Sequence, residues 1–158
     1  MNRVQFFLLA TLILALASCN NDPVFPLEPE IQYLDIQPRE VRHLQDPFTI
    51  SISFTDGDGD IGGDNVDGSP LIIRDDRVLD PAYAHLPDSL FFYDNYSFDD
   101  LSSDAQNPSI KGNIFVEIPQ AVNVEGRRRE EFTFSVILVD RAGNKSNEIT
   151  TDPLVVFR

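Results

Sequence analysis

Five aspartates lie close together in the segment that begins at residue 56. Counted from the first of them, carboxylates stand at positions 1, 3, 5, 9 and 12 of a twelve-residue window: Asp56, Asp58, Asp60, Asp64 and Asp67. Carboxylates this close repel one another unless a cation neutralises them. Calcium suits such a cluster because it accepts about six to eight oxygen ligands in irregular geometry, and the alternating glycines let the chain curl so that the carboxylates converge. We therefore predict a calcium site built on Asp56, Asp58 and Asp60, with Asp64 and Asp67 as additional candidates.

This aspartate spacing resembles the calcium loops of EF-hands, dockerins and thrombospondin type 3 repeats. Those loops carry glycine at the sixth position, where this chain has Ile61, and a glycine follows at position 62. Because no helices are predicted on either side of the loop, we do not infer an EF-hand. The alternative interpretation of the segment is a flexible acidic turn, or an Asp-Gly hairpin, that binds no metal.

Between residues 31 and 158 the chain alternates short apolar runs with polar turns. The clearest run, Phe48–Phe54, places apolar side chains at every second position with hydroxyls between them, which is the pattern of a half-buried strand. Seven such runs predict an all-β domain, an antiparallel seven-stranded immunoglobulin-like β-sandwich, with a closed barrel as the alternative. One helical turn is expected at 81–86, and one or two turns are expected at 99–106. The predicted strands are Ile31–Ile36, Phe48–Phe54, Leu71–Arg74, Leu90–Tyr93, Ile114–Ile118, Phe132–Leu138 and Leu154–Phe157.

The order of the predicted strands indicates which loops surround the acidic segment. If the seven strands run up and down, the second, fourth and sixth end at the same pole of the sandwich. The loops at 55–70, 94–112 and 140–148 then lie together. Asp140 follows the sixth predicted strand, so we expect its carboxylate to face the acidic loop and to serve as a more distant calcium ligand.

Two stretches of the sequence resemble a known group of domains. One is the end of the second strand with the motif DGDGDIG, Phe54 to Gly62, and the other is VDRAGNKSN, Val139 to Asn147. Together they resemble immunoglobulin- or cadherin-like β-sandwich domains of bacterial surface lipoproteins, and the resemblance covers mainly residues 47–63 and 132–157. It implies the fold and a calcium site, and it implies little about activity.

The first 19 residues carry the pattern of an export signal. A basic start at Arg3 precedes an apolar run from Phe6 to Ala17, which ends in Leu-Ala-Ser before Cys19, the only cysteine of the chain. Small residues before a cysteine resemble a bacterial lipobox. This resemblance implies that residues 1–18 are removed as a signal peptide and that Cys19 is lipidated. A retained transmembrane helix is the alternative, but the apolar run is shorter than the roughly 20 residues that span a bilayer.

Lipidation would place the protein on a membrane of the cell envelope. Several acyl chains, at about 0.8 kcal/mol per buried methylene group, would anchor it firmly. Asn20 follows the cysteine, where some inner-membrane lipoproteins carry a retaining aspartate, so we expect the outer membrane. Prolines at 23, 26 and 29 predict an extended tether over residues 19–30 that connects the lipid to the domain at 31–158.

The composition of the chain excludes some partners. It contains 26 acidic and 12 basic residues, which give a net charge of −14. An excess of this size repels nucleic acid and anionic lipid head groups, so we expect neither as a partner. Hydrophobic residues make up 42% of the chain and twelve phenylalanines require burial, so the acidic composition does not indicate disorder.

Two classes of function follow from these observations. The sequence contains no nucleophile elbow, no His-Glu pair and no phosphate-binding glycine loop, so we do not expect an enzyme. The first class is a non-catalytic binding or structural module that is lipid-tethered and stabilised by calcium. The alternative is a surface glycan-binding protein, in which Tyr96 and Phe98 of the 94–112 loop would stack on sugar rings. The same rings could instead cover the core.

Overall fold

The computed structural model describes residues 24–63, 71–101 and 109–158. These residues are all-β, as predicted, with strands joined by turns and by three short 3₁₀ helices. The predicted signal peptide at 1–18, Cys19, Asp64 and Asp67 lie outside the described residues. The strands are β1 (Glu30–Gln37), β2 (Glu40–Arg42), β3 (Phe48–Asp56), β4 (Leu71–Asp75), β5 (Tyr93–Tyr96), β6 (Ile110–Ile118), β7 (Arg129–Phe132), β8 (Phe134–Leu138), β9 (Ile149–Thr150) and β10 (Leu154–Phe157). The 3₁₀ helices are η1 (Asp76–Leu79), η2 (Pro81–Tyr83) and η3 (Asp88–Leu90).

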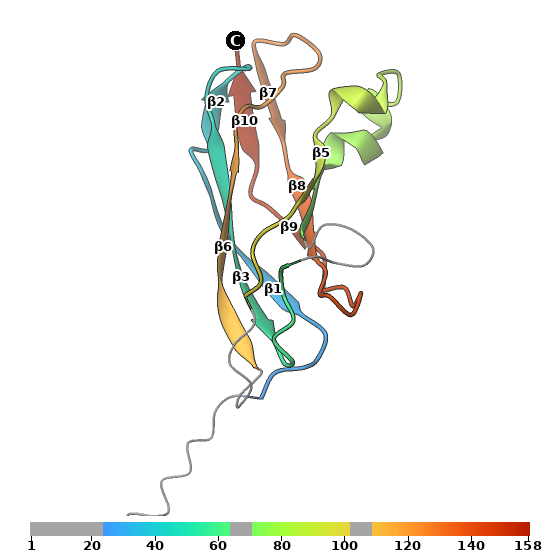
Figure 1. Cartoon of the computed structure of the whole chain (residues 1–158). Coiled ribbons are helices and arrows are strands. Elements are labelled where there is room, and N and C mark those ends of the chain that lie inside the picture. The colour runs from blue at the N-terminus through green and yellow to red at the C-terminus, as the bar shows by residue number, and fades with distance from the viewer. Residues whose placement is uncertain (1–23, 64–70, 102–108) are drawn as a thin grey trace, which may run out of the picture.

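The strands pair into three sheets, with the orders β1-β3-β6, β2-β10-β7 and β5-β4-β8-β9. Figure 1 shows the first sheet on one side of the molecule and the sheet that contains β5 and β8 on the other. Apolar side chains from all three sheets form one core, which includes Ile52 of β3, Val136 of β8 and Leu154 of β10. In the part of the chain that is described, no helix has the length and apolar character needed to cross a membrane.

Strand β3 forms the middle of the first sheet and follows its predicted pattern, with alternate residues buried and half-buried. The antiparallel strand β1 pairs with β3, and a bulge between Tyr33 and Asp35 shifts their register. In a regular strand Ile31 and Ile36 would lie on opposite faces, because an odd number of positions separates them. The extra residue of the bulge resets the alternation, so both side chains face the core. The buried side chains of β3 are Phe48, Ile50, Ile52, Phe54 and Asp56.

Some predicted elements require correction. The predicted strand Leu90–Tyr93 is wrong, because η3 ends at Leu90 and β5 begins only at Tyr93. Strand β6 is longer than predicted, since it begins at Ile110 instead of Ile114. Strands β2 and β9 are missing from the prediction because so few residues show no periodicity. A 3₁₀ turn, η2, is present in the segment 81–86, whereas residues 99–101 are not helical and 102–106 lie outside the described residues.

The predicted strand Phe132–Leu138 divides at Thr133. Strand β7 pairs with β10, whereas β8 pairs with β4 and β9, so the chain passes from one sheet to another at this residue. Thr133 itself belongs to neither strand and forms hydrogen bonds with Asp76. Its hydroxyl donates to Asp76 Oδ2 at 2.7 Å, and its carbonyl accepts the N–H of Asp76 at 3.1 Å. Phe132 and Phe134 on either side are both buried. The break therefore connects two sheets without interrupting the core.

The pairing departs from an all-antiparallel arrangement of successive strands in two respects. Strand β3 pairs with β1 and β6 and not with β4, the next core strand along the chain. Strand β2 runs parallel to β10, because the chain leaves β1 through a bend at residues 38–39 and does not turn back in a hairpin.

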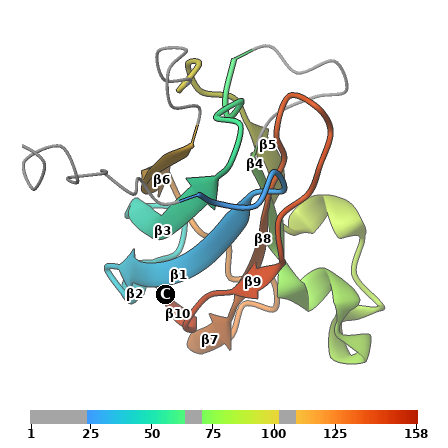
Figure 2. The ribbon, with the colours of Figure 1, turned by 90° about the horizontal axis from the view of Figure 1, so that it is seen from below.

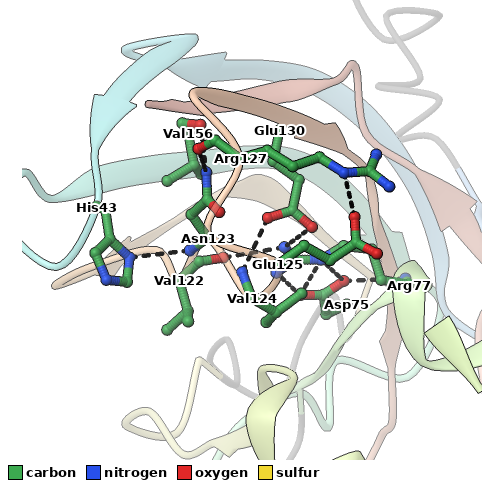
Figure 3. Close-up of polar contacts among 10 residues, drawn as sticks. All are labelled: His43, Asp75, Arg77, Val122, Asn123, Val124, Glu125, Arg127, Glu130 and Val156. Atoms are coloured by element: carbon green, nitrogen blue, oxygen red, sulfur yellow. Dashed lines mark hydrogen bonds and ion pairs between the residues drawn. The ribbon is translucent and has the colours of Figure 1, made fainter. Parts of the chain in front are cut away.

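A charged cluster is buried at the end of β4. Asp75, Arg77 and Glu130 are each at most 4% exposed. Arg77 Nη2 lies 2.6 Å from Asp75 Oδ2, and Arg77 Nη1 forms an ion pair with Glu130 Oε1 at 3.0 Å and donates to the carbonyl of Val122 at 3.0 Å (Figure 3). The guanidinium carbon lies 3.3 Å from the ring centroid of Phe132. Arg77 thus connects η1 to β7 and to the segment that precedes β7.

We expect Arg77→Met to lower the free energy of unfolding by about 3–5 kcal/mol, because it leaves two buried carboxylates without their cation. Urea unfolding followed by circular dichroism would measure the change. The control is Arg39→Met. Arg39 pairs with Asp35 and Asp152 at the surface, where its side chain is 52% exposed, and its loss should cost about 0–1 kcal/mol. Equal losses in the two variants would contradict the assigned role of Arg77.

Candidate metal centre

Three carboxylates converge where strand β3 ends. Asp56 is the last residue of β3, and Asp58 and Asp60 follow in the loop. Each of them offers one carboxylate oxygen, and these oxygens lie within 4.8 Å of one another. Asp56 is fully buried, Asp60 is half-buried and Asp58 is exposed. The centre therefore extends from the core to the surface, and its oxygen donors could hold a metal ion.

In each of Asp56 and Asp60, only one of the two carboxylate oxygens accepts a hydrogen bond. Asp56 Oδ2 accepts the N–H of Asp60 at 3.1 Å, and Asp60 Oδ2 accepts the N–H of Ala142 at 3.1 Å. The other oxygens, Asp56 Oδ1 and Asp60 Oδ1, are buried and have no hydrogen-bond partner. A buried oxygen without a donor is costly. Two such oxygens beside a third carboxylate fit a cation that accepts hard oxygen ligands.

Burial and mutual repulsion disfavour the charged forms of these carboxyls. Burial is the main cause that raises the pKa of Asp56 to about 6, and the charge of Asp58 adds to it. Burial also raises the pKa of Asp60, followed in importance by the charges of Asp140 and Asp58. A bound divalent cation would reverse both effects, because it favours the ionised carboxylates.

Two other segments form backbone hydrogen bonds with the acidic loop. The carbonyl of Asp60 accepts the N–H of Arg141 at 3.1 Å, and the carbonyl of Ile61 accepts the N–H of Leu101 at 2.9 Å. Gly63 donates to the carbonyl of Phe98 at 2.9 Å. Figure 2 looks onto this pole, with the loop after β3 beside the start of the described chain and the turn after β8. The described parts of the loops at 55–70, 94–112 and 140–148 therefore lie together, as we expected from the sequence.

Two glycines permit this close packing. Gly62 has φ of +83°, and a Cβ there would lie 2.2 Å from the carbonyl oxygen of Asp99. A Cβ at Gly57 would lie 2.4 Å from the carbonyl oxygens of both Phe25 and Pro26. No other residue type fits at either position without displacing backbone. The end of the predicted tether thus packs directly against the acidic loop.

Ile61 accounts for the departure from the glycine of EF-hand-type loops. Its side chain is fully buried and belongs to the hydrophobic core. In this chain the sixth position of the loop therefore fastens the loop to the core, and the positive-φ turn follows at Gly62 and Gly63. Burial of an isoleucine side chain stabilises this attachment by roughly 1.5–3 kcal/mol.

Asp140 lies near the three aspartates, but it is not one of the residues whose carboxylate oxygens converge. It is 1% exposed, and its charge raises the pKa of Asp60. Its Oδ1 accepts the N–H of Asn144 and its Oδ2 accepts the Asn144 side-chain amide, both at 2.7 Å. Asp140 therefore organises the turn after β8, and its role as a distant ligand stays a prediction.

The aromatic residues of the 94–112 loop differ in their exposure. Tyr96 and Phe98 are partly buried and pack against the core, and the ring of Phe92 stacks on Tyr96 at a centroid distance of 6.4 Å. Tyr93 is 62% exposed. Tyr96 and Phe98 thus cover part of the hydrophobic core, which is the alternative role that the sequence left open for them. Glycan binding by these residues stays a prediction.

One neighbour of the site was not anticipated from the sequence. This is the backbone at residues 25–26, which contacts the loop at Gly57, whereas the segment from Phe98 to Leu101 belongs to the 94–112 loop that we expected beside the acidic loop. The glycines were a usable signal, since a glycine at the end of a strand often marks a close backbone approach. The identity of the approaching segment was not readable, because it depends on long-range packing.

A scan against models of protein families, a search of the curated proteins and a search of the solved structures each find no match to this chain.

The raised pKa of Asp56 makes the stability of the metal-free domain depend on pH. Its pKa is about 6 in the folded state and about 3.9 when unfolded. The folded state therefore binds the proton more tightly, and the stability from this group is complete below pH ~4 and is lost as pH rises through ~6. In a chelator we expect the free energy of unfolding of the wild type, relative to Asp56→Asn, to fall on the order of 2–3 kcal/mol between these pH values.

Urea unfolding of both proteins across this pH range would measure the difference, and the comparison cancels the titration of the groups that do not interact with Asp56. A constant difference would contradict the burial of an ionisable Asp56 without a cation.

Proposed function

We propose that this chain is an exported, lipid-anchored lipoprotein whose immunoglobulin-like β-sandwich carries a structural calcium ion and acts as a non-catalytic binding or structural module. The observation that carries the proposal is the pair of buried, unpartnered oxygens of Asp56 and Asp60 beside Asp58. Calcium would account for these oxygens and for the charge of the cluster.

The donor set favours calcium over other divalent ions. All three side chains are carboxylates, which are hard ligands, and thiolate or imidazole ligands for a softer metal are lacking among the residues of the cluster. The loop backbone contains three positive-φ glycines, Gly59, Gly62 and Gly63, which let the chain follow an irregular course around an ion. Magnesium demands such geometry and retains its water, whereas calcium accepts irregular sites.

The arrangement of strands supports a sandwich of the immunoglobulin- or cadherin-like kind. The sheet with β3 at its centre and the sheet that contains β4 and β8 contribute their apolar faces to one core. A loop that binds calcium at one pole, close to the point where the chain enters the domain, is consistent with the resemblance of the two motifs, Phe54–Gly62 and Val139–Asn147. The parallel pairing of β2 with β10 is compatible with such a sandwich.

The lipid anchor is proposed from the lipobox-like sequence before Cys19. In Figure 1 the first described residues lie at the pole opposite the C-terminus. Residues 25–26 also contact Gly57, so the tether would enter the domain beside the calcium loop. The proposed location is the outer membrane, with the domain held off its surface by the extended, proline-containing tether.

Calcium should stabilise the folded protein measurably. For the whole chain in a mild detergent, free calcium at about one hundred times its Kd should add about 2.7 kcal/mol to the free energy of unfolding. Asp58→Asn should weaken calcium binding about tenfold or more. The matched control Asp94→Asn removes one exposed charge from β5 and should leave the calcium effect unchanged. Melting curves with calcium, with magnesium and with a chelator would measure these effects, and identical curves in calcium and chelator would refute the calcium assignment.

Lipidation should depend on one side chain. Metabolic labelling with a fatty-acid analogue in a bacterial host should label the wild-type chain and fractionate it with membranes. Cys19→Ala should remove the label, because no other thiol exists in the chain. The matched control Ser18→Ala keeps a small residue before the cysteine and should retain the label. Labelling that persists in Cys19→Ala, or is lacking in the wild type, would contradict the proposed anchor.

A further inference from the structure

Strand β6 is a long edge strand with an open side. It pairs with β3 over all nine of its residues, Ile110–Ile118, without a register shift. In the described residues no other segment pairs with β6 or bonds to its backbone. Figure 1 shows β6 at the rim of its sheet. An edge strand of this length with an uninterrupted register presents a row of unpaired backbone donors and acceptors, which is a template for another strand.

The other edge of the same sheet is treated differently. On β1, the N–H of Ile31 donates to Asn147 Oδ1 at 2.9 Å, and its carbonyl accepts from Asn147 Nδ2 at 2.9 Å. One side chain thus saturates the backbone of β1 at that point, and the bulge at Tyr33–Asp35 distorts the rest of the edge. Both are common ways to block strand addition. Strand β6 shows neither device in the described structure.

The outer face of β6 carries an isolated apolar side chain. Phe115, near the centre of the strand, is 67% exposed. Its cross-strand partner on β3 is Ser51, and the exposed neighbours on its own strand are Asn113 and Glu117. No apolar partner is therefore available to Phe115 from the adjacent strand. Burying such a ring against a further strand would stabilise an association by up to roughly 1.5–3 kcal/mol.

The sequence of β6 is complementary to itself in one antiparallel register. When Ile114 of one copy lies opposite Ile114 of a second copy, all nine residues of the strand find a partner. Lys111 then lies opposite Glu117, and this pairing occurs twice because the arrangement is two-fold symmetric. Phe115 lies opposite Asn113, which places the two phenylalanine rings diagonally across the strand pair, within reach of each other.

We propose that β6 is a homodimer interface, at which the β6 strands of two copies pair antiparallel about a two-fold axis through Ile114 and join two three-stranded sheets into one. The exposed strand edge supplies the backbone hydrogen bonds, Phe115 supplies apolar contact, and the Lys111–Glu117 pairs select this register. Shifting the register by two residues separates these charges and leaves residues unpaired. This proposal does not depend on the metal or on the lipid anchor.

Charge reversal provides a sharp test, because the register makes a specific prediction for mixtures. Lys111→Glu places glutamates opposite each other, and Glu117→Lys does the same with lysines. Each variant alone should therefore dimerise about tenfold or more weakly than the wild type. Mixed together, the two variants should form a heterodimer, because both cross-strand pairs are again of opposite charge. The double variant Lys111→Glu/Glu117→Lys should dimerise like the wild type.

Light scattering coupled to size-exclusion chromatography of the whole chain in a mild detergent would measure these masses, with two distinguishable tags for the mixture. Unchanged melting temperatures would show that the variants are folded, and Phe115→Ala should weaken the dimer in the same assay. A wild-type chain that stays monomeric at high micromolar concentration overturns the proposal. So does a dimer that ignores the charge reversals, or a pair of single variants that fails to associate when mixed.

Discussion

The concentration of negative charge at the end of β3 is the constraint on which the rest of this pole depends. Asp56 is fully buried, its Oδ1 has no partner, and the charge of Asp58 acts on it at close range. A folded domain can accommodate such a group only by protonating it or by neutralising it with a cation. The surrounding segments therefore enclose a cluster of carboxylates whose combined charge is unfavourable without a ligand.

The packing around the loop explains how so unfavourable an arrangement is held. Ile61 fastens the loop to the core, Gly62 and Gly57 let two other backbones approach within contact distance, and Arg141 donates its N–H to the carbonyl of Asp60. These contacts come from residues far apart in the sequence. The loop is thus shaped mainly by the sheets that carry its neighbours, and a cation would bind to a geometry that is largely formed in advance.

A second cluster of buried charges, at the C-terminal end of β4, is neutralised in another way. Arg77 is surrounded by Asp75, Glu130 and the ring of Phe132, so the chain supplies its own cation to neutralise buried carboxylates. The acidic loop contains no such residue, and the side chain of Arg141 pairs with Asp100 instead. The contrast between a self-neutralised cluster and an unneutralised one within a single core points to an external ion at the second.

Local patterns in the sequence determined the all-β class, the course of β3 and the convergence of Asp56, Asp58 and Asp60, because alternation and aspartate-glycine spacing act over a few residues. Only the tertiary structure decided the parallel pairing of β2 with β10, the change of sheet at Thr133 and the contact of residues 25–26 with Gly57. These features depend on which strands pair, and pairing is set by the packing of distant side chains into one core. Short-range periodicity therefore carries no information about them.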